Sequence, residues 1–204
     1  MWNIFLLIAD SLLTDKGILD EFIDIICVPL INFMNKDPVT FKQCQLEYNG
    51  QKTTCLDLFC QVVFKCLQLQ RDKGDEIEAC CCISLVIAML ENIPDVSSVI
   101  PNIIDMYNGE INAGVHTKEF RVMLLQGYMM CMWYDCNTTL QALESGQRTA
   151  WLMEEVFKIV TELDNDFEVK RFMLGLSSIL VPAEMPATIQ NNYSTIIRVL
   201  VYLS

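Results

Sequence analysis

The sequence has a single histidine, His116, and no Cys-x-x-Cys pair among its ten cysteines. A protein zinc site normally uses such a pair, or histidines at a fixed spacing. A Cys–His catalytic dyad could use only His116, which precedes an expected helix start, where a solvated residue is ordinary. No P-loop, Gly-x-Gly-x-x-Gly or Gly-x-Ser-x-Gly motif occurs. We therefore expect no enzyme activity, no bound metal and no cofactor.

Turn-forming residues are also scarce, with 6 prolines and 8 glycines, whereas 52% of the residues are hydrophobic. That mix excludes a disordered chain and argues against an all-β sandwich, so it favours long helices. No apolar run reaches about 18 residues, the length that spans a membrane. The apolar N-terminus contains Asp10 and lacks the basic start of a signal peptide. We expect no membrane insertion.

Basic residues are outnumbered: there are 14 Lys and Arg against 26 Asp and Glu, for a net charge of −12. Nucleic acids and anionic lipid surfaces are bound by basic proteins, and this chain would repel both. The natural complement of such a charge is a basic protein partner. An alternative is that the acidic charge serves solubility alone.

Cysteine is plentiful by contrast, and three cysteines, Cys80 to Cys82, are consecutive in the stretch EACCCISLVIAML. Successive helix positions point about 100° apart, so these thiols cannot converge on one ion. Adjacent cysteines also rarely bridge each other, because the disulfide would be strained. We expect reduced thiols that serve as small apolar side chains. The helix should be covered on two sides, along the stripes Ile77, Cys81, Ser84, Leu85, Ala88 and Ile83, Val86, Ile87, Leu90.

Helical periodicity runs through the whole chain. It predicts about ten helices, at 2–13, 18–34, 53–70, 76–91, 95–110, 117–134, 137–145, 149–163, 166–181 and 187–203. The expected helix-start signals are Thr53-Thr54, Asp75, Pro94-Asp95, Thr117 and Asp166. Residues 35–52 form the one long connection, in which Asn49-Gly50 could close a small hairpin.

The helices repeat in pairs. The segments 25–34 and 98–107 share a pattern, with Pro29 and Pro101 at the same point. Predicted helix starts at 76, 117 and 166 are 41 and 49 residues apart, close to the 40–47 residues of HEAT-type units. We therefore predict an all-α fold, an armadillo-like α-α superhelix of HEAT repeats over residues 1–204; an irregular helical bundle is the alternative.

Apolar residues stand at both ends of the chain, in Trp2, Ile4, Phe5 and Leu6 and in IIRVLVYLS. A solenoid normally ends in polar capping repeats. We expect apolar surface at both ends, and either a longer array or a partner subunit to cover it.

Four stretches carry a family resemblance: residues 1–36, IPNIIDMYNGEI, TKEFRVMLLQGYMMCMWYDCNTTLQALES and DFEVKRFMLGLSSILVPAEMP. In the same order, they resemble the C-terminal half of importin-β-type nuclear transport receptors, nearest the branch of importins seven and eight. The helix end Trp133-Tyr134-Asp135 is the most family-like part. The chain is several times shorter than a complete receptor and lacks the N-terminal repeats that engage Ran-GTP and the acidic tail of this branch.

The resemblance implies a segment of a nuclear import receptor that wraps basic cargo, such as ribosomal proteins and histones. In the full-length protein Ran-GTP would release the cargo, and nucleoporins would be further partners. The protein would shuttle between cytoplasm and nucleus through the nuclear pore. No catalytic residue carries over from the family. The alternative function is a HEAT-repeat scaffold for a non-transport assembly, which would not respond to Ran-GTP.

Acidic residues are the candidate partner-binding groups. By solenoid geometry the second helix of each pair would line the concave face. The candidates there are Asp20, Asp24, Asp95, Asp105, Glu154, Glu155 and Glu162.

Overall fold

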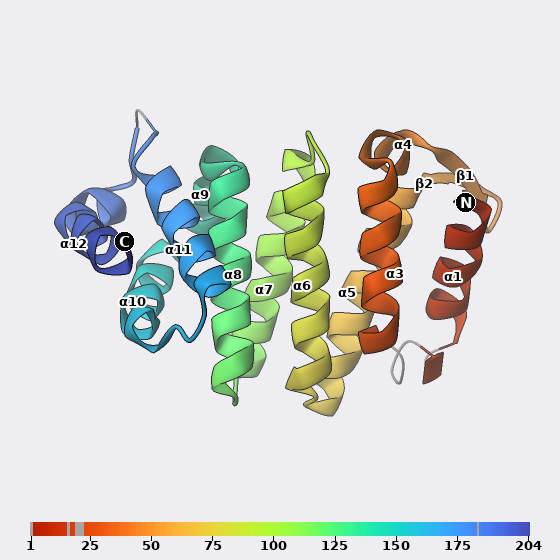
Figure 1. Ribbon diagram of the computed structural model, residues 1–204, viewed down its shortest axis with the longest axis horizontal. Coiled ribbons are helices and arrows are strands. Elements are labelled where there is room, and N and C mark those ends of the chain that lie inside the picture. Colours follow the sequence, from red (N-terminus) through yellow and green to blue (C-terminus); the bar gives the residue numbers. More distant parts are fainter. Residues whose placement is uncertain (1, 16, 19–22, 183) are drawn as a thin grey trace. The chain divides into compact units, whose positions relative to one another are not determined.

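The computed structural model describes residues 2–15, 17–18, 23–182 and 184–204 of the chain (Figure 1). Over these residues the fold is all-α, with eleven α-helices, two 3₁₀ turns and a single two-stranded hairpin. The chain divides into two compact units. Unit 1 contains Met1–Asp95 and Val115–Phe120, and unit 2 contains Val96–Gly114 and Arg121–Ser204. The predicted all-α, solenoid-like class is confirmed.

Unit 1 is built from paired and stacked helices. Its elements are α1 (Trp2–Thr14), α3 (Ile23–Lys36), α4 (Pro38–Gln43), β1 (Gln45–Tyr48), β2 (Gln51–Thr54), α5 (Cys55–Lys73) and α6 (Glu76–Asn92). Helix α6 packs against both α3 and α5, and α5 also packs against α1. The start of α3 lies beside the start of α6, as shown by a hydrogen bond from the Asp24 backbone N–H to the Glu78 carboxylate. Helices α3 and α6 therefore run parallel, in one layer (Figure 1).

Unit 2 continues the all-helical pattern. Its elements are η1 (Ser97–Val99), α7 (Ile100–Ala113), α8 (Lys118–Tyr134, of which Arg121 onward belongs here), α9 (Cys136–Ser145), α10 (Thr149–Ile159), η2 (Val160–Glu162), α11 (Asp166–Ile179) and α12 (Ala187–Leu203). Helix α7 packs against α9, and α12 packs against both α10 and α11.

Local hydrogen bonds explain where several helices begin. Thr54 caps α5 in a capping box: its hydroxyl accepts from the Asp57 N–H, and the Asp57 carboxylate accepts from the Thr54 N–H. The Asp75 carboxylate caps α6 by accepting from the N–H groups of Ile77 and Glu78. Gly74 ends α5 at φ 75°, a left-handed conformation that glycine adopts without strain.

Three sequence predictions about helix ends need correction. The helix expected from residue 95 begins at Ile100, after a 3₁₀ turn, because Asp95 has φ 53° and cannot continue a helix there. The cap of α11 is Asn165, and Asp166 is the first helical residue. The helix expected over 149–163 ends at Ile159 and tightens into the 3₁₀ turn η2.

The long connection 35–52 holds more structure than the sequence predicts. The hairpin is present, with Asn49 at φ 51° and Gly50 at φ 74° in its turn. The additional element is α4, which starts on Pro38 with Asp37 as its cap. Phe41 anchors α4 because its ring is fully buried and lies edge-on to Phe5, with 5.1 Å between the ring centroids.

The proline correspondence between the two repeat segments does not hold in the structure. Pro29 lies inside α3, whereas Pro101 lies in the first turn of α7. Proline is tolerated in a first turn because its missing N–H would have no intrahelical partner there. The two prolines therefore occupy different positions in their helices.

Helix α6 carries the cysteine triplet and is covered on two sides, as predicted. Cys82 is fully buried, and from Leu85 to Leu90 every side chain is buried. Neighbours on both flanks, α3 and α5, account for this burial. The prediction fails at Ile77, which was placed in a buried stripe but is 79% exposed in the first turn of the helix.

Helix α8 is the equivalent buried element of unit 2, where small residues allow close contact. A Cβ built on Gly175 of α11 would lie 2.6 Å from the Met129 carbonyl oxygen of α8. A Cβ on Gly127 of α8 would lie 2.6 Å from the Tyr107 Oη. Glycine is required at both places because any side chain would overlap a neighbouring helix.

Candidate functional site

The predicted acidic residues are mostly at the surface. Asp24, Asp95, Asp105, Glu154 and Glu162 are exposed, and Glu155 is half-buried. Asp20 lies outside the described residues. Asp24 and Asp95 belong to unit 1, and the other four described candidates belong to unit 2.

In unit 1, Asp24 lies beside two acidic residues, Asp75 and Glu78, that were not among the candidate partner-binding residues. Burial raises the pKa of Glu78, and the nearby carboxylates of Asp24 and Asp75 raise it further. The sequence identified Asp75 only as a helix-start signal, and Glu78 is a further acidic residue in the same first turn, where a negative charge is favourable for the helix dipole. Their closeness to Asp24 results from the packing of α3 on α6, and no local sequence pattern predicts it.

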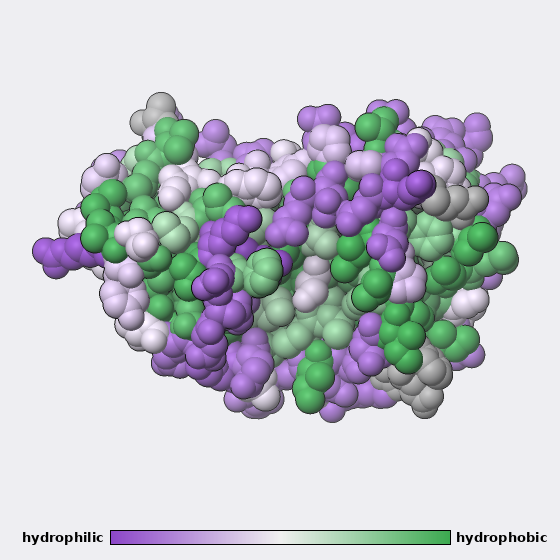
Figure 2. All heavy atoms as spheres, in the orientation of Figure 1, coloured by the Kyte–Doolittle hydropathy of each residue, from purple (hydrophilic) through white to green (hydrophobic). Residues whose placement is uncertain are grey.

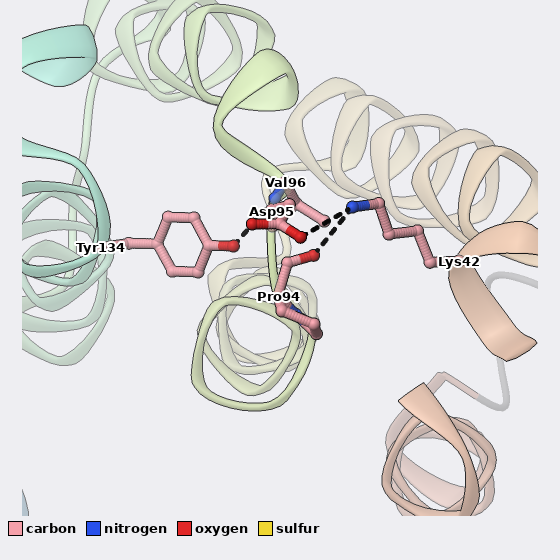
Figure 3. Close-up of polar contacts among 5 residues, drawn as sticks. All are labelled: Lys42, Pro94, Asp95, Val96 and Tyr134. Carbon is pink, nitrogen blue, oxygen red and sulfur yellow. Dashed lines mark hydrogen bonds and ion pairs between the residues drawn. The ribbon is translucent and has the colours of Figure 1, made fainter. Parts of the chain in front are cut away.

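Asp95 is the second candidate of unit 1, and a lysine lies opposite it. The Lys42 Nζ donates to the Pro94 carbonyl oxygen at 3.1 Å and lies 3.7 Å from the Asp95 Oδ2 (Figure 3). The Asp95 side chain is 90% exposed, so this ion pair contributes little stability. Lys42 partly neutralises the charge of Asp95 at the surface.

The unit 1 candidates do not form one patch. Asp24 lies by the start of α6, and Asp95 follows its end. A helix of 17 residues separates them, which is about 25 Å at 1.5 Å per residue.

In unit 2, three of the candidates lie on α10 and η2. The Glu155 Oε1 lies 2.8 Å from the Lys158 Nζ, and its Oε2 lies 3.6 Å from the Arg121 Nη1. Glu155 is therefore compensated locally, and Glu154 and Glu162 are exposed.

A hydrogen bond within unit 2 holds the chain ahead of α7. The Val96 N–H donates to the Tyr134 Oη at 2.8 Å (Figure 3). Tyr134 is part of the helix end that carried the family resemblance, and Asp135 immediately after it caps α9 by accepting from the Thr138 N–H. This helix end thus has a structural role, because it fixes both the segment before α7 and the start of α9.

His116 takes part through its backbone in a hydrogen-bonded clamp. The Glu76 carboxylate accepts hydrogen bonds from the backbone N–H groups of His116 and Thr117, each at 2.6 Å, and from the Thr117 hydroxyl. Burial acts to raise the pKa of Glu76, but these hydrogen bonds outweigh it and hold the pKa below its usual range. Thr117 in turn caps α8 through the Phe120 N–H. Glu76 therefore joins the starts of α6 and α8.

Unit 1 also has an apolar groove between α1 and α3, of about 300 Å³. It is lined by Ile4, Leu7, Ile8, Ser11, Leu12, Ile18, Ile26 and Pro29. Figure 2 shows apolar side chains gathered over these two helices. Leu7 is 66% exposed and Val201 of α12 is 70% exposed, so the expected apolar surface is present on the first and last helices.

The described residues show neither of two other kinds of site. Among them, no group of three or more His, Cys, Asp and Glu side chains has the geometry to hold a metal ion. None of the described helices is both long and apolar enough to cross a membrane. Comparison of the chain with known protein families, with curated proteins and with solved structures finds no match.

Proposed function

We propose that this chain binds basic protein segments through its exposed carboxylates, as the cargo-binding part of a nuclear import receptor. The observation that carries the proposal is a net charge of −12 on a scaffold of stacked helices, with Asp24, Asp105, Glu154 and Glu162 exposed. A surface of one charge sign attracts a partner of the opposite sign from a distance. The resemblance to the receptor branch of importins seven and eight supplies the biological setting.

The supporting argument is electrostatic, and it limits which candidates contribute. A carboxylate that faces a nearby cation adds little to the field that a partner meets. Glu155 and Asp95 each have such a cation, at 2.8 Å and 3.7 Å, respectively. Asp24 adds to the charge of Asp75 and Glu78, so the start of α6 is the most acidic part of unit 1 that we identify.

Binding to a basic cargo is the first test. The 204-residue chain would be titrated with a fluorescently labelled dimer of core histones over a series of salt concentrations. We expect affinity to fall steeply with salt, because exposed charges are screened within about 10 Å at 0.1 M. Affinity that does not depend on salt, or absence of binding at low salt, would contradict the proposal.

Ran regulation is tested separately, in the full-length protein. Ran loaded with GTP is expected to bind and to eject the cargo, whereas Ran loaded with GDP is not. If basic cargo binds this chain but the full-length protein ignores both forms of Ran, the chain is a scaffold for a non-transport assembly. The two tests therefore separate the acidic surface from the transport role.

A further inference from the structure

The cysteine triplet presents its three thiols to three different neighbours. Cys81 faces α3, where the Cys27 Sγ lies 3.8 Å from the Cys81 carbonyl oxygen. Cys82 faces α5, where it forms a thiol–thiol hydrogen bond with Cys66. Cys80 is close enough to Glu119, at the start of α8, for that carboxylate to raise its pKa after the larger effect of burial. Helix α6 therefore takes part in two facing thiol pairs.

The two pairs differ in their access to solvent. Cys66 and Cys82 are both 0% exposed. Cys81 is half-buried and Cys27 is 9% exposed, so this pair can be reached from the surface. A small oxidant in solution meets Cys81 first.

Hydrogen bonding also distinguishes the two thiols of the accessible pair. The Cys27 thiol donates to the Cys81 carbonyl oxygen at 3.8 Å. It also lies close enough to the Cys81 thiol for a side-chain hydrogen bond, which is the main reason that the pKa of Cys81 is lowered. The same bond, followed by burial, raises the pKa of Cys27. Burial and the carboxylates of Glu78, Asp24 and Asp75 act against the thiolate of Cys81 but do not outweigh the hydrogen bond. Cys81 is the more exposed thiol of the pair, so it is the nucleophile that an oxidant in solution reaches. The lowered pKa of Cys81 agrees with this role, since the thiolate is the reactive form.

We propose that Cys27 and Cys81 are a reversible oxidation site, which forms a disulfide between α3 and α6 when the protein meets hydrogen peroxide. The inference does not depend on the proposed transport function. It concerns two side chains that already lie side by side in a packed helix pair.

The chemistry proceeds in two balanced steps. The Cys81 thiolate attacks one peroxide oxygen, the O–O bond breaks, and the products are a Cys81 sulfenic acid and hydroxide, which takes up a proton to become water. The Cys27 sulfur then attacks the Cys81 sulfur, and the departing hydroxide takes the Cys27 proton and leaves as a second water. Two thiols are oxidised and one peroxide is reduced to two waters. A thiol reductant such as dithiothreitol reverses the reaction by exchange.

Trypsin places Cys27, Cys66 and the cysteine triplet on three different peptides, so mass spectrometry can identify which cysteines are linked. Cys27 falls on the peptide 17–36, Cys66 on 66–71, and the whole triplet on 74–118. After brief treatment of the folded 204-residue chain with hydrogen peroxide, followed by alkylation of the remaining thiols, we expect a 17–36/74–118 cross-link that dithiothreitol removes. The 66–71/74–118 cross-link reports the inaccessible pair and should form much more slowly.

Serine variants assign the link to one cysteine of the triplet. Cys81→Ser should abolish the 17–36/74–118 cross-link, and Cys80→Ser, the neighbouring control, should leave it at the wild-type level. Cys27→Ser should leave a Cys81 sulfenic acid that dimedone traps. Circular dichroism checks that each variant is folded.

The wild-type peptide map alone can overturn the proposal. If peroxide oxidises other thiols while the 17–36/74–118 cross-link fails to form, the pair is not an oxidation site. Faster formation of the Cys66–Cys82 link than of the Cys27–Cys81 link would contradict the role given to solvent access. Persistence of the cross-link in folded Cys81→Ser would assign it to another thiol.

Discussion

Glycine at position 175 determines how closely α11 approaches α8. A Cβ at this position would lie 2.6 Å from the Met129 carbonyl oxygen and 2.7 Å from the Met129 Cβ. Backbone atoms cannot turn aside as a flexible side chain can, so the helices would have to separate. The contact between these helices therefore rests on the absence of one methyl group.

The first prediction concerns that glycine. Gly175→Ala should lower the free energy of unfolding by about 1–3 kcal/mol, the usual range for an overpacked core. Gly146→Ala is the matched control, since its nearest neighbour is 3.6 Å away and its φ is −88°. Urea denaturation measures both variants. Equal stability of the two variants would show that α8 and α11 are not in this close contact.

Glu76 gives a prediction about pH. A depressed pKa in the folded state means that the ionised carboxylate stabilises the fold above its ordinary pKa, and that this stabilisation is lost as pH falls. Glu76→Gln should therefore be less stable than the wild type at pH 7. The difference should shrink below about pH 4, near the ordinary pKa of glutamate.

Thermal unfolding of the Glu76→Gln variant from neutral pH down to about pH 3.5, below the ordinary pKa of glutamate, follows this difference. Glu144→Gln, at an exposed position in α9, controls for the general effect of removing one negative charge. If the difference in unfolding temperature between wild type and Glu76→Gln stays constant across this range, the charge of the carboxylate does not strengthen its hydrogen bonds to His116 and Thr117.

At the level of the single element, α5 depends on its capping box. The Thr54 hydroxyl accepts from the Asp57 N–H at 3.0 Å and donates to the Asp57 Oδ2 at 2.8 Å. Thr54→Ala removes both bonds and should cost about 1 kcal/mol of stability. Thr53→Ala, one residue earlier on the same strand, keeps the capping box and should cost less. Urea denaturation compares the two, and an equal loss would assign the effect to the strand.

Local chemistry decided which elements could be predicted from the sequence. Asn49-Gly50 predicts the hairpin turn because both residues tolerate the positive φ that the turn requires. Asp75 predicts the start of α6 for an equally local reason. Helix α4 was missed because its six residues are too few to show a period, and what holds it is the burial of Phe41 against Phe5 and Phe59.

The candidate site was harder to predict than the fold. The sequence shows which residues are charged, but it does not show which residues from distant parts of the chain lie close together. The sequence identifies Asp24 and Glu155 as acidic residues on helices. Only tertiary packing places Asp24 beside Glu78, or Arg121 of α8 beside Glu155. The facing thiols Cys27 and Cys81 are 54 residues apart, so no spacing rule connects them.

For the whole molecule, the distribution of charge between the units gives a further prediction. Reversal of Asp24 to Lys tests unit 1, and joint reversal of Asp105, Glu154 and Glu162 to Lys tests unit 2. Each variant should weaken binding of a basic cargo and flatten its dependence on salt, since fewer charges take part. Glu155→Gln, at a carboxylate already paired with Lys158, is the control and should change binding least.

Fluorescence anisotropy with the labelled histone dimer measures this series. If one unit's variant loses affinity and the other's does not, the cargo contacts that unit alone. Unchanged affinity in both would remove these carboxylates from the binding surface.

The double-sided burial of α6 also has a consequence for biosynthesis. Both of its flanking helices, α3 and α5, precede it in the chain. When α6 leaves the ribosome, the surfaces that receive Cys81 and Cys82 have therefore already been made. Most of this buried helix can therefore pack before later sequence is translated. Only the contact between its start and the segment Val115–Phe120 has to form afterwards.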